Sequence, residues 1–225
     1  DVYKRQGIPI GDLGGGMFAV MGIQAALIAR ENTNKGQHVD ISMLDCQISM
    51  LNYMATMHPM SGKVPEPIGN SHFVHVPYNT FKTKTDMIVI ACVGDQFWPP
   101  LLDLLDDKEL RDSRFEFAPS RLKEKAYIEE RINNVLINER AGYWLEKLEN
   151  ARIPCARVNN VSQAMSDPQI MARNMVVDLK HPLKGSAQVP GNPIKLSETN
   201  EDSYSPPPLL GAHNDEVLKE WLNKG

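Results

Sequence analysis

Gly11-Asp12-Leu13-Gly14-Gly15-Gly16 is the stretch that decides the fold, and it runs straight into the apolar residues 17–30. We expect residues 17–30 to form a helix that is buried on most sides, because apolar side chains occupy nearly its whole circumference. Asp is a favoured N-cap residue, since its oxygen accepts an otherwise unpaired N–H of the first turn. A carboxylate there is also stabilised by the helix dipole. The glycines remove side chains around Asp12, so another molecule or backbone can approach closely.

The residues alone leave two interpretations of Asp12 open. In one, Asp12 caps a tightly packed helix and its role is structural. In the other, it is a catalytic carboxylate in a pocket of bare backbone, able to act as a nucleophile toward an activated acyl group or as an acid or base. The amides of Gly14, Gly15 and Gly16 could then hold an oxyanion.

The composition is that of a globular protein with a sizeable core. The 225 residues are 42% hydrophobic and 23% charged, close to the average for soluble chains. A formal net charge of -4, with both signs mixed along the chain, argues against a nucleic-acid partner. Cys46, Cys92 and Cys155 lack metal-ligand spacing, which predicts buried free thiols in a reducing compartment. No signal peptide is visible and the apolar residues 17–29 are too few to span a bilayer, so we expect a cytoplasmic protein with no membrane partner.

Hydrophobic periodicity predicts two structural parts. In the first, the helix is followed by a strand at residues 38–43 and a second helix at 45–57, as in the tail of an α/β layer. A crossing rich in Pro and Gly follows at residues 59–69. The second part is predicted to be a separate α+β unit. Its expected strands are 80–83, 87–93, 155–158, 175–179 and 188–189; its expected helices are 95–105, 121–138, 140–150, 161–165, 168–174 and, after an extended segment at 190–208, 211–222.

His72 and His75 are three residues apart in a predicted loop that begins Gly69-Asn70-Ser71. Such a pair could bind a metal ion, but no third ligand is near it in the sequence, so we predict no metal site. We expect these histidines to be solvated or to contact a substrate.

Several segments, in a fixed order, resemble the class III CoA-transferase family, which includes formyl-CoA transferase, carnitine CoA-transferase and the α-methylacyl-CoA racemases. The resemblance extends over residues 8–222. The segments that carry it are Gly11–Gly16 with its helix, 26–45, Gly69-Asn70, Pro77-Tyr78, 81–83, Arg121, 153–155, 167–173, 190–194 and 207–218.

The resemblance implies a mixed fold, α/β with α+β: the remnant of a Rossmann-like large domain plus a smaller α+β domain, in a family of interlocked dimers. It implies the following division: residues 1–6, a foreign or artefactual start; 7–60, the end of the large CoA-binding domain with the catalytic Asp; 61–78, a linker and the active-site loop; 79–189, the small domain; 190–225, a tail and helix that return to the large domain.

The family's active-site aspartate precedes a glycine-rich helix start and matches Asp12. The resemblance therefore implies an acyl-CoA:carboxylate CoA-transferase, in which Asp12 attacks an acyl-CoA thioester and forms a mixed anhydride. Coenzyme A is then a substrate rather than a tightly bound cofactor, and we assign Gly14, Gly15 and Gly16 to its binding. Gly69, Asn70, Ser71 and His72 are assigned to the substrate loop. Formyl-CoA transferase carries a run of glycines in this loop, so the departure here leaves the identity of the acids open.

Two alternatives remain at this point. A racemase or epimerase of 2-methylacyl-CoA esters would use the same Asp12 as an acid or base, and a non-catalytic remnant of the fold would not use it at all. The resemblance also implies partners: an acyl-CoA, a small carboxylic acid and a second copy of the chain. Family members have a longer N-terminal half, so we expect this chain to be a C-terminal fragment that is inactive alone.

Overall fold

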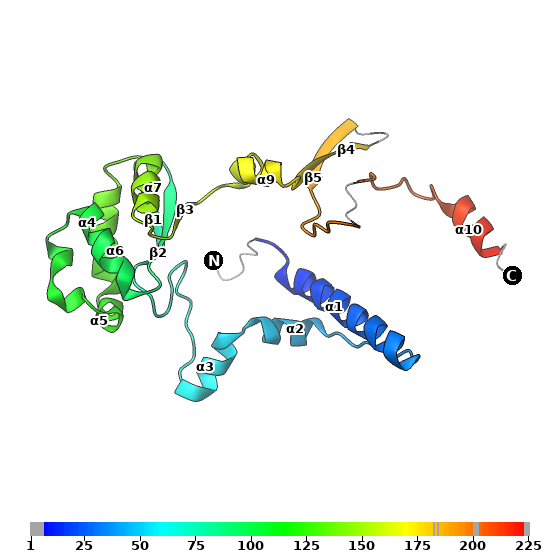
Figure 1. Cartoon of the computed structure of the whole chain (residues 1–225), viewed down its shortest axis with the longest axis horizontal. Coiled ribbons are helices and arrows are strands. Elements are labelled where there is room, and N and C mark those ends of the chain that lie inside the picture. Colours follow the sequence, from blue (N-terminus) through cyan, green and yellow to red (C-terminus); the bar gives the residue numbers. More distant parts are fainter. Residues whose placement is uncertain (1–6, 182, 184, 200–202, 223–225) are drawn as a thin grey trace. The chain divides into compact units, whose positions relative to one another are not determined.

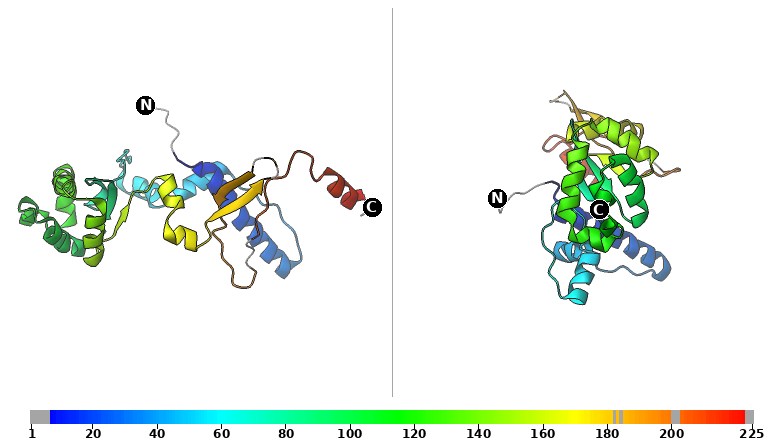
Figure 2. Two further views of the ribbon diagram at one scale, coloured as in Figure 1. Left: turned by 90° about the horizontal axis from the view of Figure 1, so that it is seen from above. Right: turned by 90° about the vertical axis from the view of Figure 1, so that its left-hand side faces the viewer.

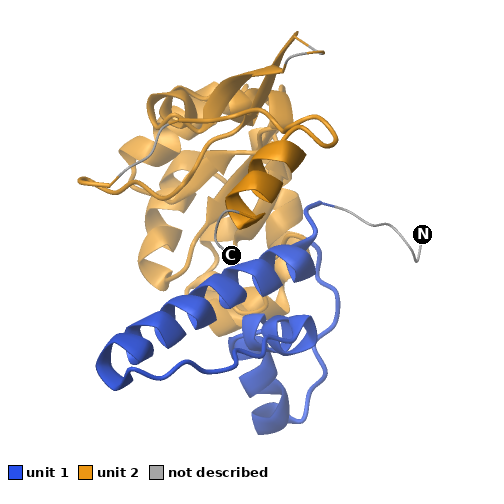
Figure 3. Ribbon diagram, turned by 90° about the vertical axis from the view of Figure 1, so that its right-hand side faces the viewer, with its two compact units in different colours: residues 1–69 blue, residues 70–225 orange. Residues whose placement is uncertain are grey.

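The chain divides into two units at the boundary between Gly69 and Asn70 (Figures 1 and 3). The computed structural model describes residues 7–181, 183, 185–199 and 203–222. These residues form helices and two antiparallel sheets, which confirms the predicted mixture of helix and strand. The Rossmann-like sheet and the proposed domain boundaries stay predictions, and the expected start at residues 1–6 lies outside the described residues.

The described residues of the first unit form three helices, α1 (Ile10–Thr33), α2 (Met43–Met50) and α3 (Tyr53–Ser61). α1 packs against α2. It ends at Thr33, beyond the expected end at residue 30, and Asn34 follows in the left-handed conformation (φ 54°) with its N–H donating to the carbonyl of Arg30 at 2.7 Å. Its start differs from the prediction, because the helix begins at Ile10 and includes all three consecutive glycines.

Two other expectations for the first unit are wrong. The single helix predicted at 45–57 is interrupted at Asn52, whose φ of 51° lies outside the helical range. The strand predicted at 38–43 is an extended segment without strand pairing to any described residue. An extended segment becomes a strand only where a second backbone pairs with it; here Val39 and Ile41 instead pack on Gly22 of α1.

The core of the second unit is a three-stranded antiparallel sheet, ordered β1-β2-β3, with helices packed against it (Figures 1 and 2). The strands are β1 (Tyr78–Lys82), β2 (Met87–Ala91) and β3 (Cys155–Arg157), with Thr80 opposite Val89 and Val89 opposite Ala156. These positions confirm the strands expected at residues 80–83, 87–93 and 155–158. α6 (Lys125–Leu136) packs against β1, and α7 (Ala141–Asn150) packs against β2 and β3; α4 (Trp98–Leu105) packs on α6 and α7, and α5 (Ala118–Lys123) packs on α6. The short 3-10 helix η1 (Asp95–Phe97) precedes α4, and η2 (Glu109–Arg111) and η3 (Ser113–Phe115) lie between α4 and α5 in the sequence.

The helical periodicity of α6 and α7 directs their apolar side chains into this core. Ile128, Ile132 and Leu136 follow at four-residue intervals, and all three are buried. Trp144 is buried as well, and its indole N–H donates to the carbonyl of Leu136 at 2.9 Å. A buried Trp whose polar atom has a partner stabilises the packing without the cost of an unpaired donor.

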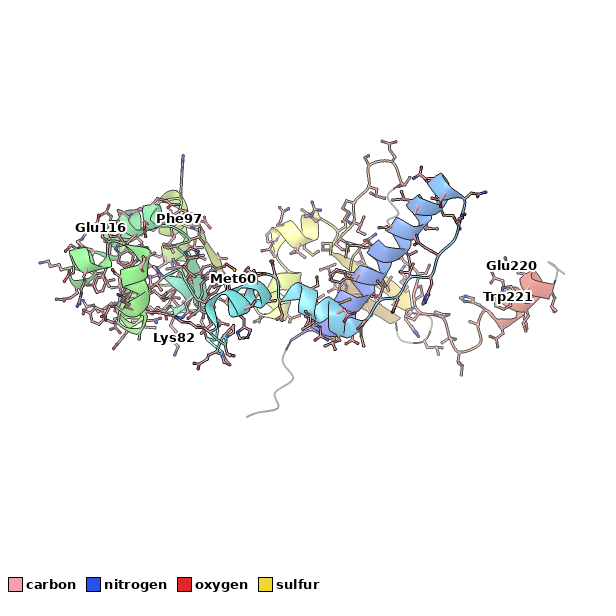
Figure 4. All side chains as sticks on the ribbon, turned by 90° about the horizontal axis from the view of Figure 1, so that it is seen from below. Met60, Lys82, Phe97, Glu116, Glu220 and Trp221 are labelled. Atoms are coloured by element: carbon pink, nitrogen blue, oxygen red, sulfur yellow. The ribbon has the colours of Figure 1, made fainter. Side chains whose placement is uncertain are left out.

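The rest of the second unit consists of smaller helices and one hairpin. They are α8 (Val161–Met165), α9 (Pro168–Ala172), the antiparallel hairpin of β4 (Val176–His181) and β5 (Gly185–Pro190), and α10 (Asn214–Leu222). Side-chain caps begin the two short helices: Asn160 forms a capping box with Gln163, and Asp167 accepts from two amides of α9. In α10 the apolar side chains are exposed, Trp221 among them (Figure 4).

α1 corrects the expectation that no apolar run is of membrane-spanning length. Its 24 residues include an 18-residue window of mean hydropathy 1.4, long and apolar enough to cross a bilayer by length and composition. Core helices of soluble proteins pass the same test, so these properties do not by themselves make α1 a membrane span. Most of its large apolar side chains are exposed in this chain. They are Ile10, Leu13, Met17, Val20, Met21, Ile23, Leu27 and Ile28.

Candidate active site

Asp12 lies in the first turn of α1, and its side chain is exposed. The predicted N-cap role is wrong: the N-cap residue is Pro9, and no side-chain oxygen caps the helix. Within the part of the chain that the structure describes, the Asp12 carboxylate has no hydrogen bond or ion pair. A carboxylate in the first turn is stabilised by the positive end of the helix dipole. The Asp12 carboxylate therefore has no hydrogen-bond or ion-pair partner among the described residues and lies where the helix dipole stabilises its negative charge.

Two of the three consecutive glycines, Gly14 and Gly15, are explained by the close approach of α1 to α2. A Cβ on Gly14 would lie 2.4 Å from Cε of Met50, and one on Gly15 would lie 3.0 Å from Cγ of Met43. Both glycines are buried, whereas a Cβ on Gly16 would meet open space. Gly14 and Gly15 thus allow the two helices to pack closely, which is a structural role that the sequence alone does not reveal.

The helix also changes which amides can stabilise an oxyanion. The amides of Gly14, Gly15 and Gly16 lie inside α1, where each N–H donates to the carbonyl four residues before it. They are therefore not the oxyanion donors that the sequence suggested. The N–H groups that an α-helix leaves unpaired are those of its first turn, here Gly11 and Asp12. The assignment of the three glycines to coenzyme A binding stays a prediction.

Residues 70–76 form a loop that is hydrogen-bonded to the core of the second unit. The Asn70 side chain donates to Oγ1 of Thr80 at 3.3 Å, and Oγ of Ser71 accepts from the Asn79 side chain at 2.8 Å. The same Asn79 Nδ2 donates to Oε2 of Glu129 at 3.0 Å. The loop is therefore attached to β1 directly and to α6 through Asn79.

His72 contacts both its own loop and β1. The backbone N–H of His72 donates to the carbonyl of Tyr78. The ring nitrogen Nδ1 accepts from the backbone amides of Val74 (3.0 Å) and His75 (3.1 Å). Its ring stacks on those of Phe73 and Tyr78, with centroids 4.5 and 5.1 Å away, and lies 4.6 Å from the ring of His75. The prediction of a solvated or substrate-contacting histidine did not include this bonding of His72 to its own loop.

The surroundings of His72 favour a neutral ring. Burial lowers the pKa of His72 below its usual 6.5, and the nearby positive charges of His75 and Lys125 lower it further. Because Nδ1 accepts two hydrogen bonds, the proton of the neutral ring is on Nε2. Among the described residues, no group of three or more His, Cys, Asp or Glu side chains could hold a metal ion.

Arg121 holds the far end of the loop and was not assigned a role from the sequence. Its guanidinium is buried and donates to the carbonyls of Val76 (2.8 Å), Phe115 (3.0 Å) and Glu116 (2.8 Å). It also forms an ion pair of 2.5 Å with the half-exposed Asp95. No local pattern marks such an arginine, because its partners come from three separate segments.

A second set of residues that the sequence did not indicate lies on one side of α6. Lys125, Glu129 and Asn133 follow at four-residue intervals; Glu129 supports the loop through Asn79, and Oδ1 of Asn133 accepts from the amide of Lys82 in β1 at 2.9 Å. Their spacing was visible, but a polar row on an amphipathic helix is usually a solvated face. Asp12 belongs to the first unit and these residues to the second, and each group is described within its own unit.

Comparison with known proteins gives one family for nearly the whole chain. The model of CoA-transferase family III matches residues 3–214. Human succinyl-CoA:glutarate CoA-transferase is 30% identical over 219 residues, which are 97% of this chain and 50% of the human protein. Acetyl-CoA:oxalate CoA-transferase of Acetobacter aceti is 32% identical over 217 residues, 96% of this chain and 54% of that protein.

The solved structures agree with this family. The crystal structure of a CAIB/BAIF family protein from Brucella suis superposes with a TM-score of 0.81 at 29% identity, and covers 96% of this chain and 56% of that one. This chain spans about half the length of the curated relatives that it matches.

Proposed function

This chain belongs to CoA-transferase family III, and from that premise we propose that the protein transfers coenzyme A from an acyl-CoA thioester to a free carboxylic acid. The observation that carries the proposal is the family match over residues 3–214, which includes a first-turn carboxylate, Asp12, without a partner among the described residues. The curated relatives support the substrate class, since their names pair an acyl-CoA with glutarate, oxalate or mesaconate.

In the proposed reaction, the Asp12 carboxylate attacks the carbonyl carbon of the acyl-CoA. The C–S bond breaks, coenzyme A leaves as the thiolate, and the acyl group and Asp12 are joined as a mixed anhydride. The thiolate then attacks the Asp12 carbonyl, which releases the donor acid as its carboxylate and leaves a thioester on Asp12. The amides of Gly11 and Asp12 lie in the same helical turn, where unpaired N–H groups can stabilise developing negative charge.

The second half of the proposed reaction reverses the first with another acid. The acceptor carboxylate attacks the Asp12 thioester and expels the thiolate, and a second mixed anhydride results. The thiolate attacks the acceptor's carbonyl carbon, so that the new acyl-CoA leaves and the Asp12 carboxylate is regenerated. Over the full cycle the numbers of C–S and C–O bonds are unchanged, so the scheme needs no oxidant or reductant.

The remaining parts of the proposal concern partners and location. We place the loop that starts at Gly69, with Asn70, Ser71 and His72, against the carboxylic acid substrates. We also propose a cytoplasmic homodimer, which the exposed apolar side chains of α1 and α10 support, because large exposed apolar surfaces mark interaction sites.

The test is a coupled measurement of CoA transfer. Succinyl-CoA is incubated with glutarate or oxalate, and new thioesters are measured by mass spectrometry, both for this chain and for the longest product of the reading frame that encodes it. Asp12→Asn is expected to reduce the rate on the order of 10³-fold or more, because it removes the nucleophile. The matched control is Asp40→Asn, which changes another exposed carboxylate of the first unit and is expected to leave the rate unchanged.

Two results would contradict the proposal. Exchange of an α-proton of a 2-methylacyl-CoA in deuterated water, without a new thioester, would replace the transferase by a racemase. An active protein in which Asp12→Asn has no effect would remove Asp12 from the mechanism.

A further inference from the structure

The conformation of the loop 70–76 depends on one side chain of the loop itself. Two backbone donors, the amides of Val74 and His75, share one acceptor, Nδ1 of His72. The ring of His72 is also stacked on Tyr78 of β1, and its own amide donates to the Tyr78 carbonyl. His72 therefore connects Val74 and His75 of the loop to Tyr78 of the sheet.

We propose that His72 is the positioning residue of the substrate loop: its neutral ring, accepting through Nδ1, holds residues 71–76 in place, and protonation of Nδ1 releases them. The statement that this loop meets the substrate rests on the proposed function. The conformational role itself rests on the contacts of His72 alone.

The chemistry of the imidazole makes this device sensitive to pH. A protonated imidazole has an N–H on both nitrogens and accepts no hydrogen bond, so the amides of Val74 and His75 would lose their acceptor and face a positive charge. The groups with charge around the ring are His75 in the loop and Lys125 on α6, and both oppose protonation. Glu129, also on α6, reaches the loop through Asn79 and Ser71.

The sign of the pH dependence follows from the lowered pKa. We call the loop closed when Nδ1 of His72 accepts the two amide hydrogen bonds, and released when these bonds are broken. In the closed loop the pKa of His72 lies below 6.5, and in the released loop it returns to this usual value. The released form therefore binds a proton more readily than the closed form. The closed loop is fully stable above about pH 6.5 and loses stability as the pH falls from there through the lowered pKa.

Three variants of the 225-residue chain separate this role from a merely structural one. His72→Asn supplies a side-chain oxygen at the position of Nδ1 that accepts but does not titrate. His72→Ala supplies no acceptor. His75→Asn is the matched control, since it removes a neighbouring imidazole and keeps the backbone N–H that donates to His72. The two measurements are the ¹⁵N shifts of the His72 ring and the hydrogen-exchange protection of the Val74 and His75 amides.

The expected results differ for each protein. In the wild type, the neutral ring carries its proton on Nε2, and both amides are protected at least about tenfold more at about pH 7.5 than at about pH 5, after correction for intrinsic exchange. His72→Asn protects them equally at both pH values, and His72→Ala at neither, while its circular dichroism stays that of the wild type. His75→Asn keeps the direction of the pH dependence but makes it smaller, because the charge of His75 no longer opposes protonation of His72.

Three results would overturn the proposal: a wild-type ring with its proton on Nδ1, wild-type protection that does not change with pH, or His72→Ala protection equal to the wild type. The ring measurement needs no variant, so a misfolded His72→Ala leaves the proposal testable. Neither measurement uses a substrate. A lack of CoA transfer would therefore overturn the proposed function and leave the role of His72 in the loop standing.

Discussion

Replacement of Arg121 by Met should be among the most destabilising single changes in the second unit. The guanidinium is 1% exposed and forms four hydrogen bonds, three of them to backbone carbonyls. Met has a similar length and fills the space, but it leaves the carbonyls of Val76 and Phe115 without this charged donor. Asp95 is half exposed and regains water, so its contribution is small.

The expected loss is about 3–5 kcal/mol, the range found when one partner of a buried charged network is removed. Because the free energy of unfolding falls by about 2 kcal/mol per M of urea, this loss lowers the urea concentration at the unfolding midpoint by about 2 M. The assay is urea unfolding followed by circular dichroism and by the fluorescence of Trp98, which lies 5.1 Å from the guanidinium. Hydrogen exchange at Val76 and in the preceding loop should increase as well, because Arg121 holds the loop's end.

The matched control is Arg114→Met. Arg114 is about half exposed, and its ion pair with Asp112 is 3.6 Å long, so its loss should cost less than about 1 kcal/mol. If the free energy of unfolding of Arg121→Met lies within about 1 kcal/mol of that of this control, the buried hydrogen bonds of Arg121 contribute little to stability and the expected loss is wrong.

Three further outcomes follow from single contacts. Gly191→Ala should cost about 2 kcal/mol or more and raise hydrogen exchange in the β4–β5 hairpin, because the new Cβ would lie 2.1 Å from the backbone oxygen of Asn174; unchanged exchange would contradict this. Burial alone would raise the pKa of Asp107, but hydrogen bonds from Arg131 and two backbone amides outweigh it and lower the pKa. The contribution of the ionised Asp107 to the free energy of unfolding is therefore present above about pH 4 and is lost as the pH falls through the lowered pKa. The melting temperature should therefore fall more steeply below about pH 4 in the wild type than in Asp107→Asn. Burial raises the pKa of the Cys92 thiol to about 12, so iodoacetamide at about pH 8 should label it only after unfolding, and rapid labelling of the folded chain would show that the site opens.

The sequence predicts those elements whose hydrophobic pattern and partners are local. β1 and β2 follow each other through a short turn, and the buried Ile128 and Ile132 of α6 are spaced as a helix requires. Such elements form where they are expected because each residue's burial follows from its neighbours in the chain.

The differences arise where a distant contact outweighs local propensity. Consecutive glycines disfavour a helix, yet α1 includes Gly14 and Gly15 because Met50 and Met43 of α2 pack directly against them. The same applies to Arg121, a charged residue that is buried because it reaches the carbonyls of two separate segments, Val76 and Phe115–Glu116, and the Asp95 carboxylate in a third.

For the candidate site, the sequence indicates candidate residues but not their geometry. Asp12 was selected from its place before the glycines, but its position within the first turn depends on where α1 begins. His72 was expected to be solvated or to contact a substrate. The hydrogen bonds to its Nδ1 depend on how residues 72–75 turn, and no pattern in the sequence specifies that turn.

Trapping the intermediate shows whether Asp12 is the residue that becomes acylated. The protein, as this chain and as the longest product of its reading frame, is mixed with succinyl-CoA, quenched with hydroxylamine and digested, and the peptides are sequenced by mass spectrometry. Hydroxylamine converts an anhydride or thioester of a carboxylate into a hydroxamate, so we expect a hydroxamate on Asp12, absent without acyl-CoA and absent in Asp12→Asn. CoA transfer while Asp12 stays unmodified, or a hydroxamate on another carboxylate, would exclude Asp12 as the nucleophile.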